Sequence, residues 1–98
     1  MPNKNYVNGR ALEYQIMEEW REKGYEVIRA SGSHGLYDVV AFRSDRPVEF
    51  IQAKRVEDES TANRLLKSFT DTTAPSKYFH QTIAVKIKGT KQPITRTI

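Results

Sequence analysis

Residues 35–55, GLYDVVAFRSDRPVEFIQAKR, have the composition of two largely apolar strands joined by a polar turn, and three polar side chains within the strands could do chemistry. Asp38 lies in the first strand, and Gln52 and Lys54 lie in the second. Carboxylate and amide oxygens are hard ligands of the kind that Mg²⁺ or Mn²⁺ takes. Such an ion lowers the pKa of a bound water and holds a phosphate oxygen, and a nearby ammonium stabilises charge that grows on the phosphate. These residue types therefore predict phosphoryl chemistry at a divalent-metal site.

The elements that carry these three residues must bring them together. Residues 36–42 and 48–55 have the composition of strands, and the polar turn between them is so short that the strands must be antiparallel. Because side chains alternate along a strand, Gln52 and Lys54 project from the same face. Pairing around the turn then places Asp38 near them across the ladder.

A fourth candidate lies on a predicted helix over residues 9–23. Leu12, Ile16 and Trp20 recur at four-residue spacing, and Glu13 flanks this apolar stripe and does not lie on its wet side. Glu13 is therefore expected to add a second carboxylate to the same site.

A purely structural alternative explains the same residues. Asp38 and Lys54 would form one buried salt bridge in a non-catalytic sheet, and Glu13 would pair with Arg10. A charge that is buried without a partner costs several kcal/mol, on the order of 5, so either arrangement must be paired, hydrated or metal-bound.

The rest of the chain predicts a single small α/β domain over residues 1–98, with a loose arm at residues 1–8. The order α-β-β-β-α-β, with one further edge strand, predicts a mixed central sheet flanked by helices. The predicted elements beyond the first helix are a strand at 25–30, a central strand at 36–42, a strand at 48–55, a helix capped by Ser60 or Thr61 that ends before Pro75, a strand at 82–88 and an edge strand at 94–98.

The composition limits the kinds of partner and compartment expected for the chain. The 98 residues carry a formal net charge of +4, which raises the odds of a polyanionic partner such as nucleic acid. The chain has no cysteine, so neither disulfides nor thiolate metal sites hold it together. It also lacks a signal-like leader and any run near the roughly 20 apolar residues of a membrane span, so we expect a soluble cytoplasmic protein, of cellular or viral origin.

The segments NGRALEYQIMEEWREKGYEVIRASGSHGLYDVVAF and VEFIQAKRV resemble the PD-(D/E)xK nuclease superfamily, and within it the archaeal-type Holliday junction resolvases. Order and spacing agree from Arg10 to about Val56. The resemblance implies a restriction-endonuclease-like αβββαβ core. It also implies a Mg²⁺- or Mn²⁺-dependent endonuclease that hydrolyses phosphodiester bonds in four-way DNA junctions, in recombination and repair. Symmetric cutting of two strands implies a homodimer.

The same resemblance assigns roles to individual residues. Glu13, Asp38 and Gln52 match the metal-binding side chains, the carbonyl of Ala53 completes the metal ligands, and Lys54 matches the signature lysine. Ser33 resembles a loop serine near the scissile phosphate, and is counted with Glu13, Asp38, Gln52 and Lys54 as catalytic. Arg10 resembles a basic residue before the helix that contacts DNA, as Ser33 does in the loop. Arg29, His34 and Arg55 are also expected to contact DNA, because of their place near the site or in the glycine-flanked loop.

Gln52 departs from the family pattern, because this position usually holds Glu or Asp. With glutamine, Glu13 and Asp38 supply a formal charge of −2 in place of −3, so metal affinity should be weaker. Two alternatives therefore stay open: a non-catalytic or weakly active module of the same fold that binds branched DNA, and a nuclease for another DNA substrate.

Overall fold

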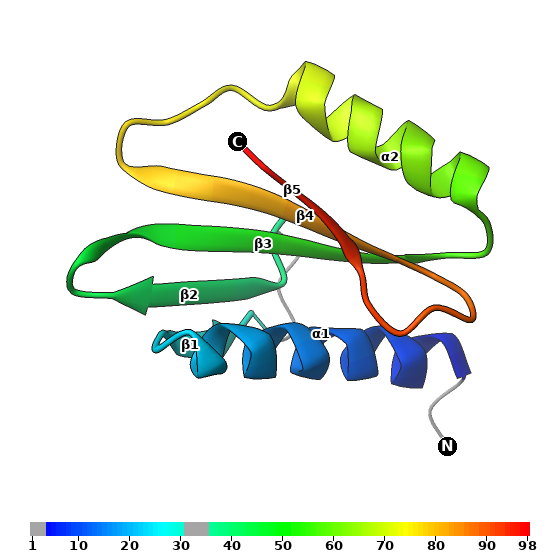
Figure 1. Cartoon of the computed structure of the whole chain (residues 1–98), viewed down its shortest axis with the longest axis horizontal. Helices are drawn as coiled ribbons and strands as arrows, with labels where there is room; N and C mark the ends of the chain where they lie inside the picture. The colour runs from blue at the N-terminus through cyan, green and yellow to red at the C-terminus, as the bar shows by residue number, and fades with distance from the viewer. Residues whose placement is uncertain (1–3, 31–35) are drawn as a thin grey trace.

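The computed structural model describes the backbone of residues 4–30 and 36–98, and the side chains of these ranges from Arg10 onward. Figure 1 shows three layers, with one helix on each side of a five-stranded sheet. The elements in chain order are α1 (Lys4–Glu22), β1 (Glu26–Arg29), β2 (Val39–Arg43), β3 (Arg46–Val56), α2 (Glu59–Thr72), β4 (Phe79–Ile87) and β5 (Ile94–Thr97).

The strands lie in the order β1-β2-β3-β4-β5, and the sheet is mixed, as predicted. β1 to β3 form an antiparallel meander, β4 pairs parallel to β3, and β5 returns antiparallel to β4. A parallel pair needs a crossover connection, and α2 supplies it between β3 and β4. The two parallel strands therefore end side by side at one end of the sheet.

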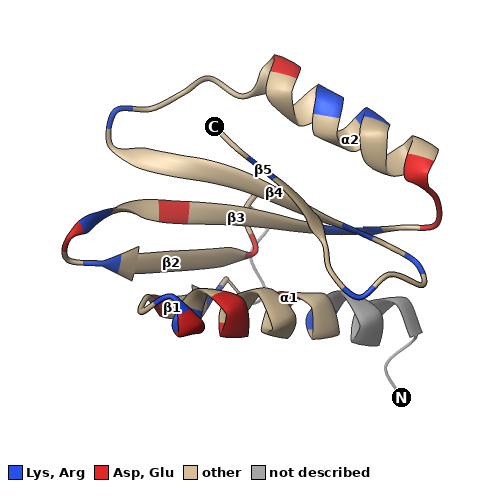
Figure 2. Cartoon of the chain, viewed as in Figure 1, with Lys and Arg blue, Asp and Glu red and all other residues tan. Residues whose placement is uncertain are grey.

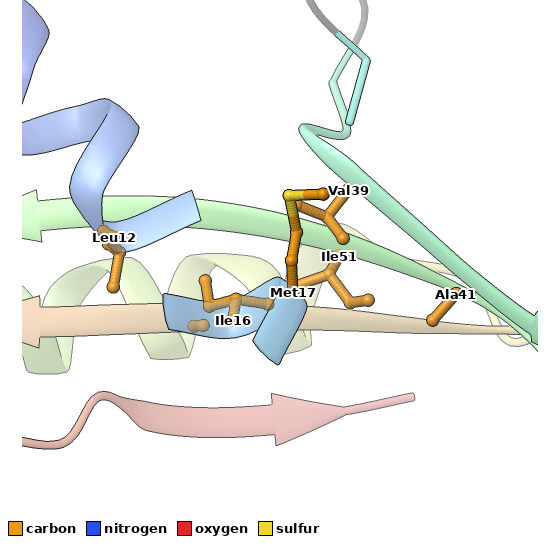
Figure 3. Packing of buried hydrophobic residues seen from close by; sticks show 7 residues of the cluster. Leu12, Ile16, Met17, Val39, Ala41 and Ile51 are labelled. Carbon is orange, nitrogen blue, oxygen red and sulfur yellow. The ribbon is translucent and has the colours of Figure 1, made fainter. Parts of the chain in front are cut away.

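Helix α1 covers one face of the sheet. Leu12, Ile16 and Met17 from the helix pack against a buried set from the strands, Val39, Ala41, Ile51 and Ala84 (Figure 3). Trp20, Tyr25, Val27 and Ala53 border this cluster. The four-residue spacing of the helix stripe and the two-residue spacing of Val39 and Ala41 meet here, which fixes the face that each strand residue occupies.

Helix α2 covers the opposite face, over β4 and the end of β3. Ala62, Leu66 and Phe69 pack against Ile83 and Val85, which alternate with the β4 residues that face α1. None of the helices in residues 4–30 and 36–98 is long and apolar enough to cross a membrane.

The predicted start of each helix needs correction. Helix α1 begins at Lys4, so most of the expected loose arm at residues 1–8 is helical, and residues 1–3 lie outside the described part. The prediction relied on apolar periodicity, which begins only at Leu12. Helix α2 is capped by Asp58, not by Ser60 or Thr61, and the Asp58 Oδ1 accepts a hydrogen bond from the Thr61 N–H at 2.8 Å. Asp and Ser are similar N-caps, so sequence does not choose between them.

Helix α1 ends in a turn that Arg43 fastens to the β2–β3 hairpin. Gly24 has a φ of +90°, the left-handed region that favours glycine. The Arg43 Nη1 donates to the carbonyl of Lys23 at 2.8 Å, and its guanidinium lies over the Tyr25 ring at 5.4 Å. These contacts fix the direction of the chain between the end of α1 and the start of β1.

Strand β2 was expected to be central, and it does lie between β1 and β3, but only one of its two apolar faces is covered by a helix. Val39 and Ala41 are buried against α1, but Phe42 is exposed on the other face, beside Ile28 of β1. The reason is the extent of α2, which packs on β4 and β3 and leaves the face of β1 and β2 uncovered. The rings of Tyr37, Phe50 and Phe79 contact one another beside this uncovered face, in a tilted and an edge-to-face pair.

Candidate active site

Asp38 lies immediately before β2, and its side chain occupies the place of a ladder partner for β3. The Asp38 Oδ2 accepts a hydrogen bond from the backbone N–H of Ala53 at 2.8 Å. Its own backbone N–H donates to the carbonyl of Ile51 at 2.9 Å. A carboxylate that accepts from a backbone N–H is held firmly in position. The structure thus brings Asp38 to the middle of the Gln52–Lys54 segment.

Gln52 and Lys54 share the face of the sheet that α2 occupies. Their register partners on β4 are Ile83 and Val85, both of which pack against α2. Lys54 is exposed and Gln52 is half-buried. Within the described residues, neither side chain forms a hydrogen bond or an ion pair, so both remain available to a ligand.

Glu13 lies on the α1 side and is engaged by Arg29. The Arg29 Nε donates to Glu13 Oε1 at 2.7 Å, and both side chains are about four-fifths buried, with 19% and 20% exposure. The Arg29 guanidinium also lies 5.6 Å from the centre of the Tyr14 ring. Arg29 was expected to contact DNA, and in this structure its Nε is committed to Glu13.

Glu13, Asp38, Gln52 and Lys54 were expected to converge at one end of the sheet, and the structure brings them there from both of its faces. Glu13 projects from the helix on the Ala53 side, whereas Gln52 and Lys54 project from the opposite side. The two sides are nevertheless linked through a backbone hydrogen bond. Ala30, the residue after Arg29, donates its N–H to the Asp38 carbonyl at 2.9 Å. Asp38 therefore stands between the two sets, at the end of the sheet.

The side-chain oxygens of this site are ligands of the type that a hard divalent cation takes, but together they carry little negative charge. Asp38 and Gln52 offer a carboxylate and an amide oxygen on neighbouring strands. The charge of Glu13 is offset by Arg29. In the part of the chain that the structure describes, no group of three or more His, Cys, Asp and Glu side chains lies close enough to hold a metal ion. Asp38 is thus the acid on which a cation here would depend most.

Of the other predicted DNA contacts, the structure describes Arg10 and Arg55. Ser33 and His34 lie outside the described residues. Arg10 is exposed on α1, and Arg55 is exposed two residues beyond Ala53 on β3. Arg55 follows the strand alternation to the α1 side, since Ala53 packs on that side.

Sequence reasoning missed a buried polar pair at the opposite end of β3. Glu49 is 5% exposed, and its Oε1 lies 2.9 Å from the Nδ1 of His80 on β4. The Glu49 Oε2 is buried and has no hydrogen-bond partner among the described residues. The signal was present, because Glu49 is the only charged residue of the apolar run VEFI, but one charge in a strand pattern does not by itself indicate burial.

A second missed contact flanks Asp38. The hydroxyl of Tyr37 donates to the Gln81 Oε1 at 2.6 Å, and the Gln81 Nε2 donates to the carbonyl of Ala74. Burial raises the pKa of Tyr37 above its ordinary value, so this phenol stays protonated at neutral pH. The residue before Asp38 is therefore tied to β4 and to the loop after α2, which stiffens the start of β2.

Comparisons with known proteins agree with this fold. A solved structure of Hjc, a Holliday junction resolvase from the archaeal hyperthermophile Archaeoglobus fulgidus, superimposes with a TM-score of 0.54 at 16% identity, over 91% of this chain and 83% of that one. At this identity the likeness shows the fold alone. A search of curated proteins finds no match. The family profile described as archaeal Holliday junction resolvase (Hjc) matches residues 4–67, which is more than half of the chain and includes α1, β1, β2 and β3. This chain belongs to the archaeal Holliday junction resolvase family.

Proposed function

We propose that the protein is a metal-dependent endonuclease that cuts four-way DNA junctions by hydrolysing phosphodiester bonds. The observation that carries the proposal is the hydrogen bond from the Ala53 N–H to the Asp38 carboxylate. It fixes an acid against the middle of the Gln52–Ala53–Lys54 segment, beside two side chains that have no partner among the described residues.

The site residues have distinct roles in this proposal. Asp38, Gln52, the Ala53 carbonyl and Glu13 would hold Mg²⁺ or Mn²⁺. The ion would supply Lewis-acid activation of water and of the phosphate at neutral pH. Lys54 orients the attacking water or offsets negative charge on the phosphate, because its exposed ammonium lies on the same face as Gln52.

Recognition of the DNA would rest on its backbone. Arg10 and Arg55 would contact phosphates, together with Ser33 and His34, which lie in the sequence between β1 and β2. Arg29 acts through Glu13, whose carboxylate it holds at 2.7 Å. Phosphate contacts carry no base information, which suits an enzyme that selects a branched shape over a sequence.

Cutting a junction on two strands requires two sites, so we propose a homodimer related by a two-fold axis. The uncovered face of β1 and β2 is the surface that fits. Ile28 is 55% exposed there and Phe42 36%, next to the ring group of Tyr37, Phe50 and Phe79. Two copies would bury this apolar surface against each other.

Cleavage of a synthetic four-way junction and of a matched linear duplex, with and without Mg²⁺, tests the activity. We expect the parent to cut only the junction and only with the metal. Asp38→Asn keeps an oxygen for the Ala53 N–H, so the fold should survive while cleavage falls by about a hundredfold or more. Metal-independent cutting, or equal cutting by the variant, would contradict the proposal.

One observation favours a second function, a module that binds branched DNA without cutting it. Gln52 contributes no charge and Glu13 is already paired with Arg29, so Asp38 is the single uncompensated acid of the site. A gel-shift on the four-way junction separates the two functions. Tight binding by the parent with no cleavage across millimolar Mg²⁺ or Mn²⁺ would support the binding module.

A further inference from the structure

The cations of this chain differ in whether a carboxylate accompanies them. Arg21, Arg29, Arg43, Lys67 and Lys88 each form an ion pair with a neighbouring acid. Several other described cations form none, and three of these, Arg55, Lys86 and Lys91, come from neighbouring positions on β3, β4 and the turn after β4. Figure 2 shows Lys and Arg positions gathered where β3 and β4 end and the β4–β5 turn passes the helix.

Arg55 and Lys86 lie side by side at that end. They are register partners on the parallel strands β3 and β4, which places them about 4.8 Å apart between strands. The residues two positions earlier, Ala53 and Ala84, both pack in the α1-side core. Both cationic side chains therefore project toward the α1 side, at the end of the sheet that carries the Asp38 contact.

Gln15 of α1 shows that Lys86 and the turn after β4 face the same surface. The Lys86 Nζ lies 3.5 Å from the Gln15 Oε1, and the Gln15 Nε2 donates to the carbonyl of Lys91 at 2.9 Å. Gln15 is neutral, so it contacts Lys86 without neutralising its ammonium, although the Gln15 Nε2 also lies 3.4 Å from the Glu19 Oε1. An ion pair at the edge of this surface joins Lys88 and Glu57 at 3.6 Å, with both side chains largely exposed.

We infer that Arg55, Lys86 and Lys91 form a phosphate-binding strip that holds the DNA arm leaving the catalytic end of the sheet. The inference rests on the proposed function, because it concerns the same DNA. Arg55 lies about 6.6 Å along the strand from Ala53, a distance that spans about two phosphates of one DNA strand along the duplex axis. Asp38 stands between the two faces of the sheet, so a DNA backbone bound there continues on the α1 side to Arg55 and Lys86. Like charges kept together without acids are stabilised when a polyanion covers them.

The test measures how salt weakens binding. Asp38→Asn serves as the background because it holds the junction uncut, and fluorescence anisotropy on a labelled four-way junction gives the association constant from about 50 to 200 mM KCl. Each phosphate contact contributes about 0.9 to the slope of log K against log salt. Adding Arg55→Gln and Lys86→Gln should lower the magnitude of this slope by about 1.8. The factor by which salt reduces the association constant over this range should then be about twelvefold smaller than in the background protein.

The matched control is Arg46→Gln with Lys77→Gln in the same background. These are one exposed arginine and one exposed lysine near the opposite ends of β3 and β4, so the net charge changes equally. The control should keep the slope of the background protein. Equal slopes in both double variants would overturn the strip and leave the proposed function standing if the parent still cuts junctions. No binding of the junction by the parent or the Asp38→Asn protein would overturn both.

Discussion

At the scale of single residues, the site is defined by how few charges it holds. Asp38 is fixed by the Ala53 N–H, Glu13 is paired with Arg29, and Gln52 is neutral. A divalent cation bound here would meet one uncompensated carboxylate. Because ligand charge count tunes the affinity for hard cations, the residue at position 52 controls how tightly metal is held.

Gln52→Glu should therefore strengthen metal binding. The side chain keeps its length and face, and it adds a second acid opposite Asp38. We expect the Mg²⁺ concentration for half-maximal junction cleavage to fall by about tenfold or more, which corresponds to about 1.4 kcal/mol. The comparison is a metal titration of cleavage, and calorimetry with Mn²⁺ alone reads binding without activity. An unchanged midpoint in both measurements would mean that position 52 does not contact the metal.

At the scale of elements, the turn after α1 orients the helix that carries Glu13. Gly24 sits at a φ of +90°, and a Cβ there would lie 3.2 Å from the Arg43 Nη1. Arg43 in turn holds the carbonyl of Lys23 and the ring of Tyr25. The angle at which α1 crosses the sheet therefore depends on this glycine and this arginine together.

Gly24→Ala should destabilise the protein by about 1–2 kcal/mol for the left-handed backbone, with an added loss from displacing Arg43. Gly89→Ala is the control, because its φ is +87° but nothing lies within 4 Å of the added Cβ. Urea unfolding should thus show a lower midpoint for Gly24→Ala than for Gly89→Ala. If the two variants were equally stable, displacing Arg43 would make no measurable contribution to the loss of stability at this turn.

At the scale of the whole molecule, the two helices cover the sheet unequally. Helix α1 packs across β1, β2 and β3, while α2 leaves the other face of β1 and β2 uncovered. That surface displays Ile28 and Phe42. Monomeric proteins seldom expose a large contiguous apolar patch, so a second copy is the partner that the proposed two-fold enzyme calls for.

Ile28→Glu should convert the dimer to a monomer. A buried, unpaired carboxylate in the interface costs several kcal/mol, on the order of 5, so dissociation should be complete at micromolar concentration. Sedimentation velocity measures the mass, and junction cleavage should change from paired cuts to single nicks. Ile94→Glu is the control, since Ile94 is 42% exposed on the other edge strand, β5. A parent that is monomeric with DNA bound would contradict the dimer.

Much of the fold and part of the site followed from local patterns. Apolar periodicity identified both helices, and the short turn after Phe42 required β2 and β3 to be antiparallel. That pairing in turn placed Asp38 beside Ala53. These predictions succeeded because they depend on spacing between neighbours in sequence, which one face of a helix or strand determines by itself.

The tertiary structure alone decided which face each group occupies and what neutralises it. Two pairings join residues on different elements: Glu13 with Arg29, and Glu49 with His80. The placement of Glu13 and Lys54 on opposite sides of the sheet likewise depends on how different elements pack. So does the strip of Arg55 and Lys86, which depends on the parallel register of β3 and β4. Sequence determined the types and local spacing of the chemical groups. Packing decided their partners, because contacts between elements depend on how both helices lie across the sheet.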